Sequence, residues 1–316
     1  MSQERRTPPC AVVWGATGFI GRHIVGALLR HGWYVRGLGR ARPDVPVDMQ
    51  ACCESRQLDF DASTEAMAPM LEGVTCAIHC AGHYDADQDE LDKYVRSVRR
   101  FAVAAHGQGV DRLVVISSIA VYGTCRDDSV SLATPPRPET PYARSRWNAE
   151  QVAQEILSMS PTRLVVVRVP AVVGVDMHSD VLRRFFRALR PGLFFHPGRS
   201  DAVFPCVGVH RLSECIVCAA DPQLRELPSV LQPVDCIPWV ELADHYGQAI
   251  GRRLSRVGLP AKAVGFACRV LGYDVASALS ALDSVVRYQD NCSVLTTQFS
   301  LPQSIDDIDA LIGTMH

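Results

Sequence analysis

Short apolar runs alternate with helix-length amphipathic segments through the first 170 residues of the chain. Five runs have the length and hydrophobicity of buried strands: 11–14, 33–38, 74–79, 113–116 and 164–169. Between them, apolar residues recur at helical spacing at 22–30, 88–106 and 142–157. We also expect a short strand at 57–61 and a helix at 63–71, with Ser63 as its N-cap. This alternation predicts an α/β fold with a doubly wound parallel sheet.

The pattern loosens after Pro170. We predict helices at 183–189, 212–220, 239–252 and 264–284, and extended segments at 203–209 and 229–234. Four prolines lie between residues 124 and 141, which have no periodicity and read as a long functional loop. We therefore expect the C-terminal half to be a smaller region that covers the substrate, and not an independent domain.

Three glycines follow the first predicted strand at GxxGxxG spacing, within the stretch VVWGATGFIG from Val12 to Gly21. In a strand-turn-helix, Gly15 allows the tight turn and Gly18 lets the backbone approach a pyrophosphate. Gly21 lets the helix pack closely on the strand, and the helix N-terminus offers N–H groups to phosphate. Because strand and helix flank the glycines, we predict a Rossmann-like dinucleotide site.

Composition and charge narrow the class of protein. The chain has 316 residues, of which 47% are hydrophobic and 21% charged, and its formal net charge is −2. With so small a net charge, no electrostatic field of the whole chain favours binding to nucleic acid. No apolar stretch reaches the roughly 18 residues of a membrane span. The 12 cysteines fall mostly in apolar segments, which favours buried thiols over metal or redox work. We expect a cytoplasmic protein, with no signal peptide and with neither nucleic acid nor membrane as a partner.

The end of the second strand bears on which dinucleotide is bound. An acid at this position accepts hydrogen bonds from the adenosine 2′-hydroxyl and repels a 2′-phosphate. Here Gly39 is followed by Arg40, and Arg42 comes next but one. A guanidinium matches a phosphate well, so we favour NADP and keep NAD as the alternative.

Three polar side chains are candidates for catalysis. Ser118 ends a predicted strand, and ligands of parallel sheets bind at such ends. Tyr142 and Arg146 are four residues apart and so share one helix face. A tyrosine that exchanges a proton, a hydroxyl that orients a carbonyl and a cation that stabilises the phenolate suit the interconversion of an alcohol and a ketone.

These motifs, in this order, resemble the extended short-chain dehydrogenase/reductase (NAD-dependent epimerase/dehydratase) family over most of the chain. Beyond the glycine turn, the segments that match are Asp59, His79-Cys-Ala81-Gly82, Ser118-Ile-Ala-Val-Tyr122-Gly123, Pro141-Tyr142-Ala-Arg-Ser145-Arg146 with Ala149-Glu150, Arg168-Val-Pro170, and Leu301-Pro302 followed by Ser304-Ile305-Asp306.

The resemblance implies catalytic roles for Ser118, Tyr142 and Arg146 and no metal site. With Arg40, it implies cofactor contacts from Gly15, Thr17, Gly18, Phe19, Ile20, Gly21, Asp59, Phe60, Ala81, Gly82, Tyr142, Arg146 and Pro170.

Two positions depart from the family pattern. Arg146 stands where the family has a lysine, and it keeps the charge but cannot deprotonate. The segment Tyr94-Val95-Arg-Ser97-Val98 lacks the asparagine of the family's NVxGT pattern. The motifs therefore predict the fold more firmly than they predict catalytic activity.

The resemblance implies an NADP-binding Rossmann domain over residues 1–175, joined by a late strand near 229–235, and a mainly substrate-binding region over 176–316. It also implies a homodimer formed through helices 88–106 and 142–157, with Trp147, Val152 and Ile156 as candidate contacts.

We expect hydride transfer at a secondary alcohol or ketone carbon of a small molecule, first of all a nucleotide-activated sugar, for which Arg199 is a candidate phosphate contact. One alternative is a ketone reductase for a sterol-like or acyl substrate held by the apolar stretch 264–282. Another is a non-catalytic NADP-binding sensor or scaffold.

Overall fold

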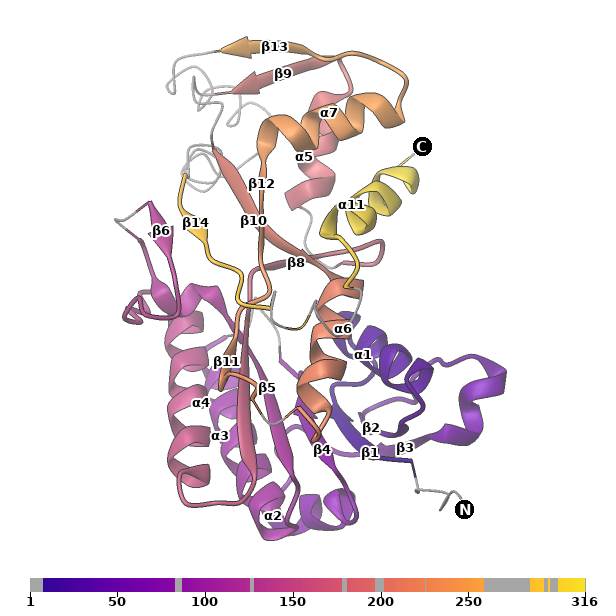
Figure 1. The fold of residues 1–316 in the computed structure, drawn as a ribbon, viewed down its shortest axis with the longest axis vertical. Coiled ribbons are helices and arrows are strands. Elements are labelled where there is room, and N and C mark those ends of the chain that lie inside the picture. The colour runs from indigo at the N-terminus through magenta and orange to yellow at the C-terminus, as the bar shows by residue number, and fades with distance from the viewer. Residues whose placement is uncertain are drawn as a thin grey trace.

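The computed structural model describes residues 8–82, 87–125, 128–177, 181–196, 202–224, 226–258, 285–292, 295 and 301–315. Arg199 and the helix predicted at 264–284 lie outside the described residues. Figure 1 shows a lower body built on a central sheet and an upper lobe of smaller sheets and helices.

The lower body contains a seven-stranded sheet in which every pair of neighbours is parallel. Its strands in spatial order are β11 (Val230–Leu231), β7 (Arg163–Val169), β5 (Arg112–Ser118), β4 (Cys76–His79), β1 (Cys10–Trp14), β2 (Tyr34–Gly39) and β3 (Cys53–Gln57). The predicted doubly wound α/β fold is confirmed.

Helices cover both faces of this sheet (Figure 1). One face carries α1 (Phe19–Arg30) and α6 (Val209–Ala220), and the other carries α2 (Thr64–Met67), α3 (Gln88–Gly107) and α4 (Pro141–Leu157). Side chains of β1 alternate between the two layers, because successive residues of a strand point to opposite faces. Both α6 and β11 come from beyond residue 175, so the C-terminal half completes the sheet and its cover.

Two predicted elements differ from the structure. The strand expected at 57–61 is wrong: β3 ends at Gln57, and residues 58–61 follow it without strand structure. β3 lies at the sheet edge and is largely polar, so it lacks the apolar signature of a buried strand. The helix expected at 63–71 continues beyond α2 only as the 3-10 helix η2 (Ala68–Leu71), because Pro69 has no backbone N–H to donate.

The upper lobe has its own core and three small sheets. Its strands are β8 (Ala171–Val173), β10 (Val203–Gly208) and β12 (Asp235–Pro238) in one sheet, β9 (Leu193–His196) and β13 (Ser255–Gly258) in a second, and β6 (Ser129–Val130) and β14 (Arg287–Tyr288) in a third. Its helices are α5 (Val181–Leu189), α7 (Trp239–Ala249) and α11 (Ser304–Gly313). Aromatic contacts fill the space between them, such as Phe186 stacked on Tyr246 with ring centroids 5.4 Å apart.

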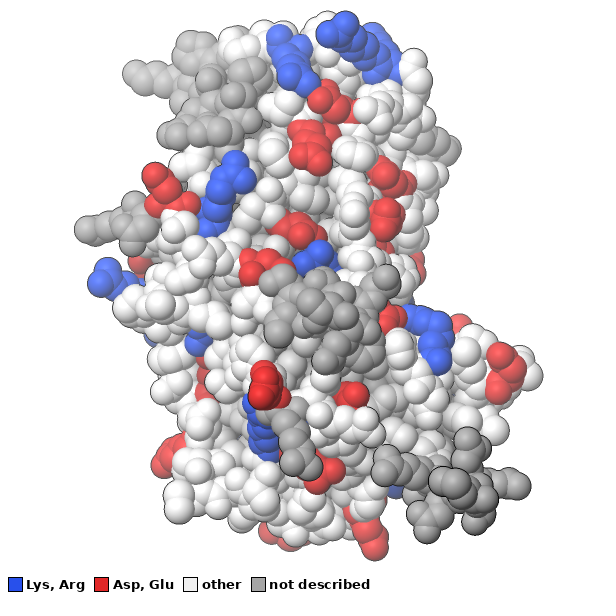
Figure 2. Space-filling model, in the orientation of Figure 1, with Lys and Arg blue, Asp and Glu red and all other residues white. Residues whose placement is uncertain are grey.

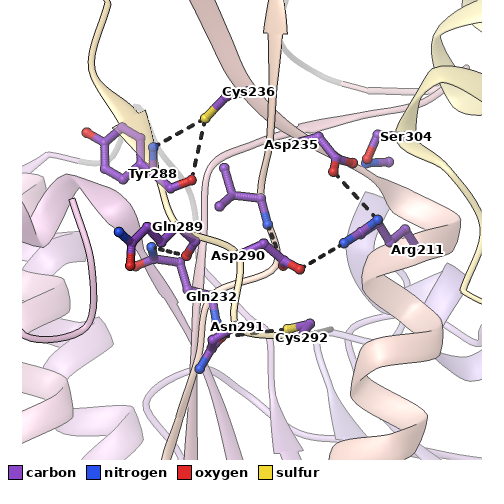
Figure 3. Close-up of polar contacts among 12 residues, drawn as sticks. Arg211, Gln232, Asp235, Cys236, Tyr288, Gln289, Asp290, Asn291, Cys292 and Ser304 are labelled. Atoms are coloured by element: carbon purple, nitrogen blue, oxygen red, sulfur yellow. Dashed lines mark hydrogen bonds and ion pairs between the residues drawn. The ribbon is translucent and has the colours of Figure 1, made fainter. Parts of the chain in front are cut away.

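Residues 287–292 form a strap that ties the lobe to the body (Figure 3). Asp290 accepts from Arg211 of α6 at 3.2 Å, and Arg211 also pairs with Asp235 of β12 at 3.5 Å. Asn291 accepts from the backbone N–H of Gln232 at 2.6 Å and donates to the Val230 carbonyl at 2.8 Å. The strap thereby fixes β11 and β12 to α6.

The glycine turn after β1 sets the position of α1. Gly15 has φ +93°, and its carbonyl accepts from the N–H of Gly18 at 3.0 Å. A Cβ at Gly21 would lie 2.0 Å from that same carbonyl oxygen, so the first turn of α1 lies directly on the turn. Only glycine permits this approach.

We expect Gly21→Ala to lower the free energy of unfolding by about 2–3 kcal/mol, because the added methyl group must displace backbone. Gly26→Ala is the matched control in the same helix. A Cβ there meets only the end of the Arg30 side chain at 3.5 Å, and alanine should raise stability by about 0.5–1 kcal/mol. Urea unfolding of both variants checks this, and equal effects would contradict it.

Candidate active site

A pocket of about 590 Å³ lies where β1, β2 and β4 end, beside the N-terminal half of α3. The carboxyl ends of parallel strands are where such sheets bind ligands. α1 begins at the pocket with Gly18 as N-cap and without a side-chain cap hydrogen bond, the arrangement in which helix N-termini accept phosphate groups.

The pocket brings together much of the predicted cofactor site. The predicted residues in its wall are Gly15, Thr17, Gly18, Arg40, Asp59, Phe60, Ala81, Gly82 and Arg146. The predicted residues outside its wall are Phe19, Ile20, Gly21, Tyr142 and Pro170. Phe19 instead packs in the lobe core, and Gly21 serves the turn rather than the wall.

Sequence reasoning missed several wall residues: Trp14, Leu58, Asp61, Cys80, Glu90, Leu91, Lys93 and Tyr94. Gly39, which the sequence placed where an acid would select the cofactor, also lies in the wall. Asp61 follows β3, and Glu90 and Lys93 lie on α3. Periodicity alone does not bring these elements to the site. Trp14 directly precedes Gly15 and Cys80 directly precedes Ala81, so their place next to predicted cofactor residues at strand ends was the available signal.

Ser118 and Tyr142 lie where β5 and α4 meet. Ser118 ends β5, and its Oγ accepts from the Ala120 N–H at 3.2 Å, which starts the 3-10 helix η3 (Ile119–Tyr122). Tyr142 is half-buried in the first turn of α4, which begins at Pro141 after the Thr140 cap. Because α4 packs against η3, the chain places both residues in one region.

Arg146 lies one turn further along α4, between two aromatic rings. Its guanidinium carbon is 3.8 Å from the ring centroid of Tyr94 and 4.8 Å from that of Tyr142. The side chain is buried, and its Nε has no hydrogen-bond partner among the described residues. Burial lowers the pKa of Arg146, but Tyr94 and Tyr142 outweigh burial and the net pKa is raised. Arg146 therefore brings a permanent positive charge to the pocket wall.

A buried ion pair supports α4 behind these residues. Arg168 of β7 donates to Glu150 of α4 at 2.7 Å, and Ser117 donates to the same carboxylate. Arg168 also donates to the Tyr122 hydroxyl at 2.9 Å, which donates in turn to Gln232 at 2.8 Å. The pair fixes α4 against β5 and β7, so the carboxylate of Glu150 is fully engaged away from Arg146.

His79, at the end of β4, is fully buried under the pocket. Its Nε2 lies 2.9 Å from Ser97 Oγ, and its ring is packed edge-on against Trp14 at 4.9 Å between centroids. Burial, with the charge of Arg146 as a smaller cause, lowers the pKa of His79 to about 3. The imidazole is thus neutral at physiological pH.

Other classes of site find little support in the described residues. No group of three or more histidine, cysteine or acidic side chains there has the arrangement of a metal site. None of the described helices combines the length and hydrophobicity required to span a bilayer. Figure 2 shows basic and acidic side chains interspersed on the visible face, without a large field of one sign.

Comparison with known proteins agrees with this geometry. Residues 11–200 match the model of the NAD dependent epimerase/dehydratase family. The chain is 27% identical over 203 residues to a putative dihydroflavonol 4-reductase of Synechocystis sp., covering 58% of this chain and 56% of that one. It is 29% identical over 189 residues to a UDP-glucose 4-epimerase of Vibrio cholerae, covering 56% of each. The matched regions thus span little more than half the length of these curated relatives.

A solved structure shares the whole fold. MoeE5 in complex with UDP-glucose and NAD superposes with a TM-score of 0.68 over 96% of this chain and 98% of that one, at 20% identity. At this identity the likeness establishes the fold alone.

We expect the stability of the chain to fall in acid because of His79. The unfolded chain takes up a proton near the ordinary pKa of about 6.5, which the folded chain resists down to about 3. The stabilisation is therefore present above pH 6.5 and is lost as the pH falls towards 3. The free energy of unfolding should therefore fall by about 2 kcal/mol between pH 7 and pH 5.

The measurement is urea unfolding at several pH values in wild type and His79→Gln, which retains a polar group for Ser97 but does not titrate. The variant should lose less stability between pH 7 and pH 5 than wild type does. Parallel pH dependences in the two proteins would contradict the assignment.

Proposed function

This chain belongs to the NAD-dependent epimerase/dehydratase family, and on that premise we propose that it binds NAD(P) in the pocket and interconverts a secondary alcohol and a ketone. The observation that carries the proposal is Arg146, which brings a permanent charge to the pocket wall beside Tyr142 and whose buried Nε has no hydrogen-bond partner among the described residues. The glycine turn fits the same cofactor, because a Cβ at Gly15 would lie 2.7 Å from the Ala81 backbone nitrogen and close the backbone cradle. The nicotinamide, when bound, supplies hydride exchange.

Three side chains are proposed to carry out proton transfer, substrate orientation and charge stabilisation. Tyr142 exchanges the proton of the substrate hydroxyl, and Ser118 holds the substrate oxygen by a hydrogen bond. Arg146 binds the cofactor ribose and stabilises the charge that develops on Tyr142. The roles of all three residues are proposals supported by their placement around the ends of β5 and α4.

For the substrate we propose a nucleotide-activated sugar. The names of two similar proteins support it, a UDP-glucose 4-epimerase and a protein solved with UDP-glucose. The second candidate is a ketone reductase for a hydrophobic substrate, which the similarity to a putative dihydroflavonol 4-reductase favours. The two activities differ in the oxidation state of the product: an epimerase leaves it unchanged, whereas a reductase lowers it.

For the cofactor we propose a preference for NADP over NAD. A Cβ at Gly39 would meet nothing closer than Thr17 Oγ1 at 3.8 Å, so β2 ends in open space. Arg40 lies in the pocket wall next to it, whereas Arg42 is not part of the wall. The similar protein solved with NAD keeps NAD open as the alternative.

We also propose a homodimer through α3 and α4, by analogy with the family. Of the three candidate contacts on α4, Trp147 and Ile156 pack against the chain's own core, which leaves Val152. A monomer mass by light scattering at micromolar concentration would contradict the dimer.

The cofactor preference gives a matched set of variants. Arg40→Ala should weaken NADPH binding by about tenfold or more, since a charged hydrogen bond contributes roughly 1.5–3 kcal/mol, and should leave NADH nearly unchanged. Gly39→Asp, which the open space accommodates, should weaken NADPH further and strengthen NADH. Arg42→Ala is the control and should change neither. Equal affinities of wild type for NADPH and NADH would contradict the preference.

The proton-transfer role of Tyr142 is tested by Tyr142→Phe. Loss of general acid–base catalysis should lower the single-turnover rate by about 100-fold or more, with the affinity for NADPH changed less than about threefold. Tyr34→Phe is the control, because its hydroxyl contacts Glu54 at 3.4 Å near the opposite ends of the strands.

The assay presents the cofactor-loaded protein with UDP-sugars and with hydrophobic ketones. A wild-type rate in Tyr142→Phe would remove that residue from the chemistry. Cofactor binding without conversion of any compound would favour the non-catalytic sensor or scaffold.

A further inference from the structure

Tyr94 and Arg146 depart together from the family pattern, and the structure brings them into direct contact. They are 52 positions apart in the sequence, on α3 and α4, yet the guanidinium carbon of Arg146 lies 3.8 Å from the ring centroid of Tyr94. This is closer than its approach to Tyr142, at 4.8 Å. Tyr94 is therefore the nearer of the two aromatic partners of this cation.

The ring of Tyr94 is held from several sides. Its hydroxyl donates to the carbonyl of Ile116 on β5 at 3.0 Å, and the ring is almost fully buried. The ring of His79 meets it edge-on, with centroids 5.5 Å apart. Ser97 donates to the Tyr94 carbonyl at 2.8 Å and also contacts His79. The aromatic face is thus a fixed surface rather than a mobile side chain.

Arg146 has little else among the described residues to hold it in place. Glu150, one turn further along α4, is engaged by Arg168 and Ser117. On the pocket side, a Cβ at Gly82 would lie 3.0 Å from Arg146 Nη2 and 3.1 Å from the Tyr94 ring, so glycine leaves the space that the pair occupies. Among the described residues, the guanidinium packs against the rings of Tyr94 and Tyr142 and is not paired with a carboxylate. Such cation–π contacts are strongest when water is excluded.

We propose that Tyr94 is the positioning residue for Arg146. The ring face fixes the plane of the guanidinium, so that its terminal nitrogens stay beside Gly82 in the pocket wall and its charge stays beside Tyr142. A planar guanidinium stacks on a ring in a way that a lysine ammonium does not, so the two departures from the family pattern form one unit. The inference rests on the proposed function, because it takes Arg146 as the cation that binds the cofactor.

The test is a double-mutant cycle read by equilibrium binding of NADPH and NADH, which needs no substrate. Tyr94→Leu should weaken binding of the preferred cofactor by about tenfold, and Tyr94→Phe, which keeps the ring, by less than about threefold. In an Arg146→Ala background, Tyr94→Leu should change affinity by less than about twofold, because a residue that acts through Arg146 has nothing left to position.

Phe101→Leu is the matched control for a merely structural role. Phe101 is a fully buried ring two turns along α3 that contacts Trp14 and His79, and no contact with Arg146 is described for it. Any effect of Phe101→Leu should be equal with and without Arg146. Tyr94→Met replaces Tyr94→Leu in the cycle if circular dichroism shows that the leucine variant does not fold.

The outcomes distinguish the cofactor role of Arg146 from the positioning role of Tyr94. If Arg146→Ala alone leaves affinity unchanged, the proposed cofactor role of Arg146 fails and the positioning role fails with it. If Arg146→Ala weakens binding while Tyr94→Leu costs the same factor in both backgrounds, only the positioning role is overturned. If Tyr94→Phe weakens binding as much as Tyr94→Leu, the hydroxyl and not the ring face is responsible, which also overturns it.

Discussion

The contact between Gly21 and the carbonyl of Gly15 leaves no room for a side chain, and the pocket depends on it. Because α1 starts directly on the turn, its uncapped N–H groups lie at the end of β1. The same turn lies against the end of β4, where a Cβ at Gly15 would strike the Ala81 backbone. Two close backbone approaches, each of which requires glycine, therefore leave space and backbone N–H groups of the kind that suit a phosphate group.

Arg146 in the pocket wall and Arg168 on β7 are both buried, and they are stabilised in different ways. Arg168 has a carboxylate, a hydroxyl and two aromatic faces, and it fixes α4 to the sheet. Arg146 lies against two aromatic rings, and its Nε has no hydrogen-bond partner in the described part of the chain. A buried charge without a counterion is costly in a folded protein. Arg168 thus has a structural role, whereas Arg146 keeps hydrogen-bonding capacity. A residue that binds an anionic ligand or its hydroxyls requires such capacity.

The sequence was informative where burial or backbone geometry imposes a pattern. The central strands are apolar on both faces, and the glycine turn has a fixed spacing, so most of the sheet and the residues Gly15, Gly18, Ala81 and Gly82 could be placed. β3 is a polar edge strand and carries no such pattern. Contacts between distant elements also left no local trace: Tyr94 stood out only as a missing asparagine, and nothing near Asp290 indicated its bond to Arg211, 79 positions away.

The route of the chain through the sheet has a consequence for synthesis on the ribosome. The strands that surround the pocket are complete by residue 79, but α6, which covers the sheet beside α1, ends only at residue 220, and β11 follows it. Until that helix emerges, α1 and β5 lack the apolar layer that α6 supplies to their shared core. The nascent chain thus lacks this cover while more than a hundred residues are added, and apolar surface exposed for that long favours aggregation.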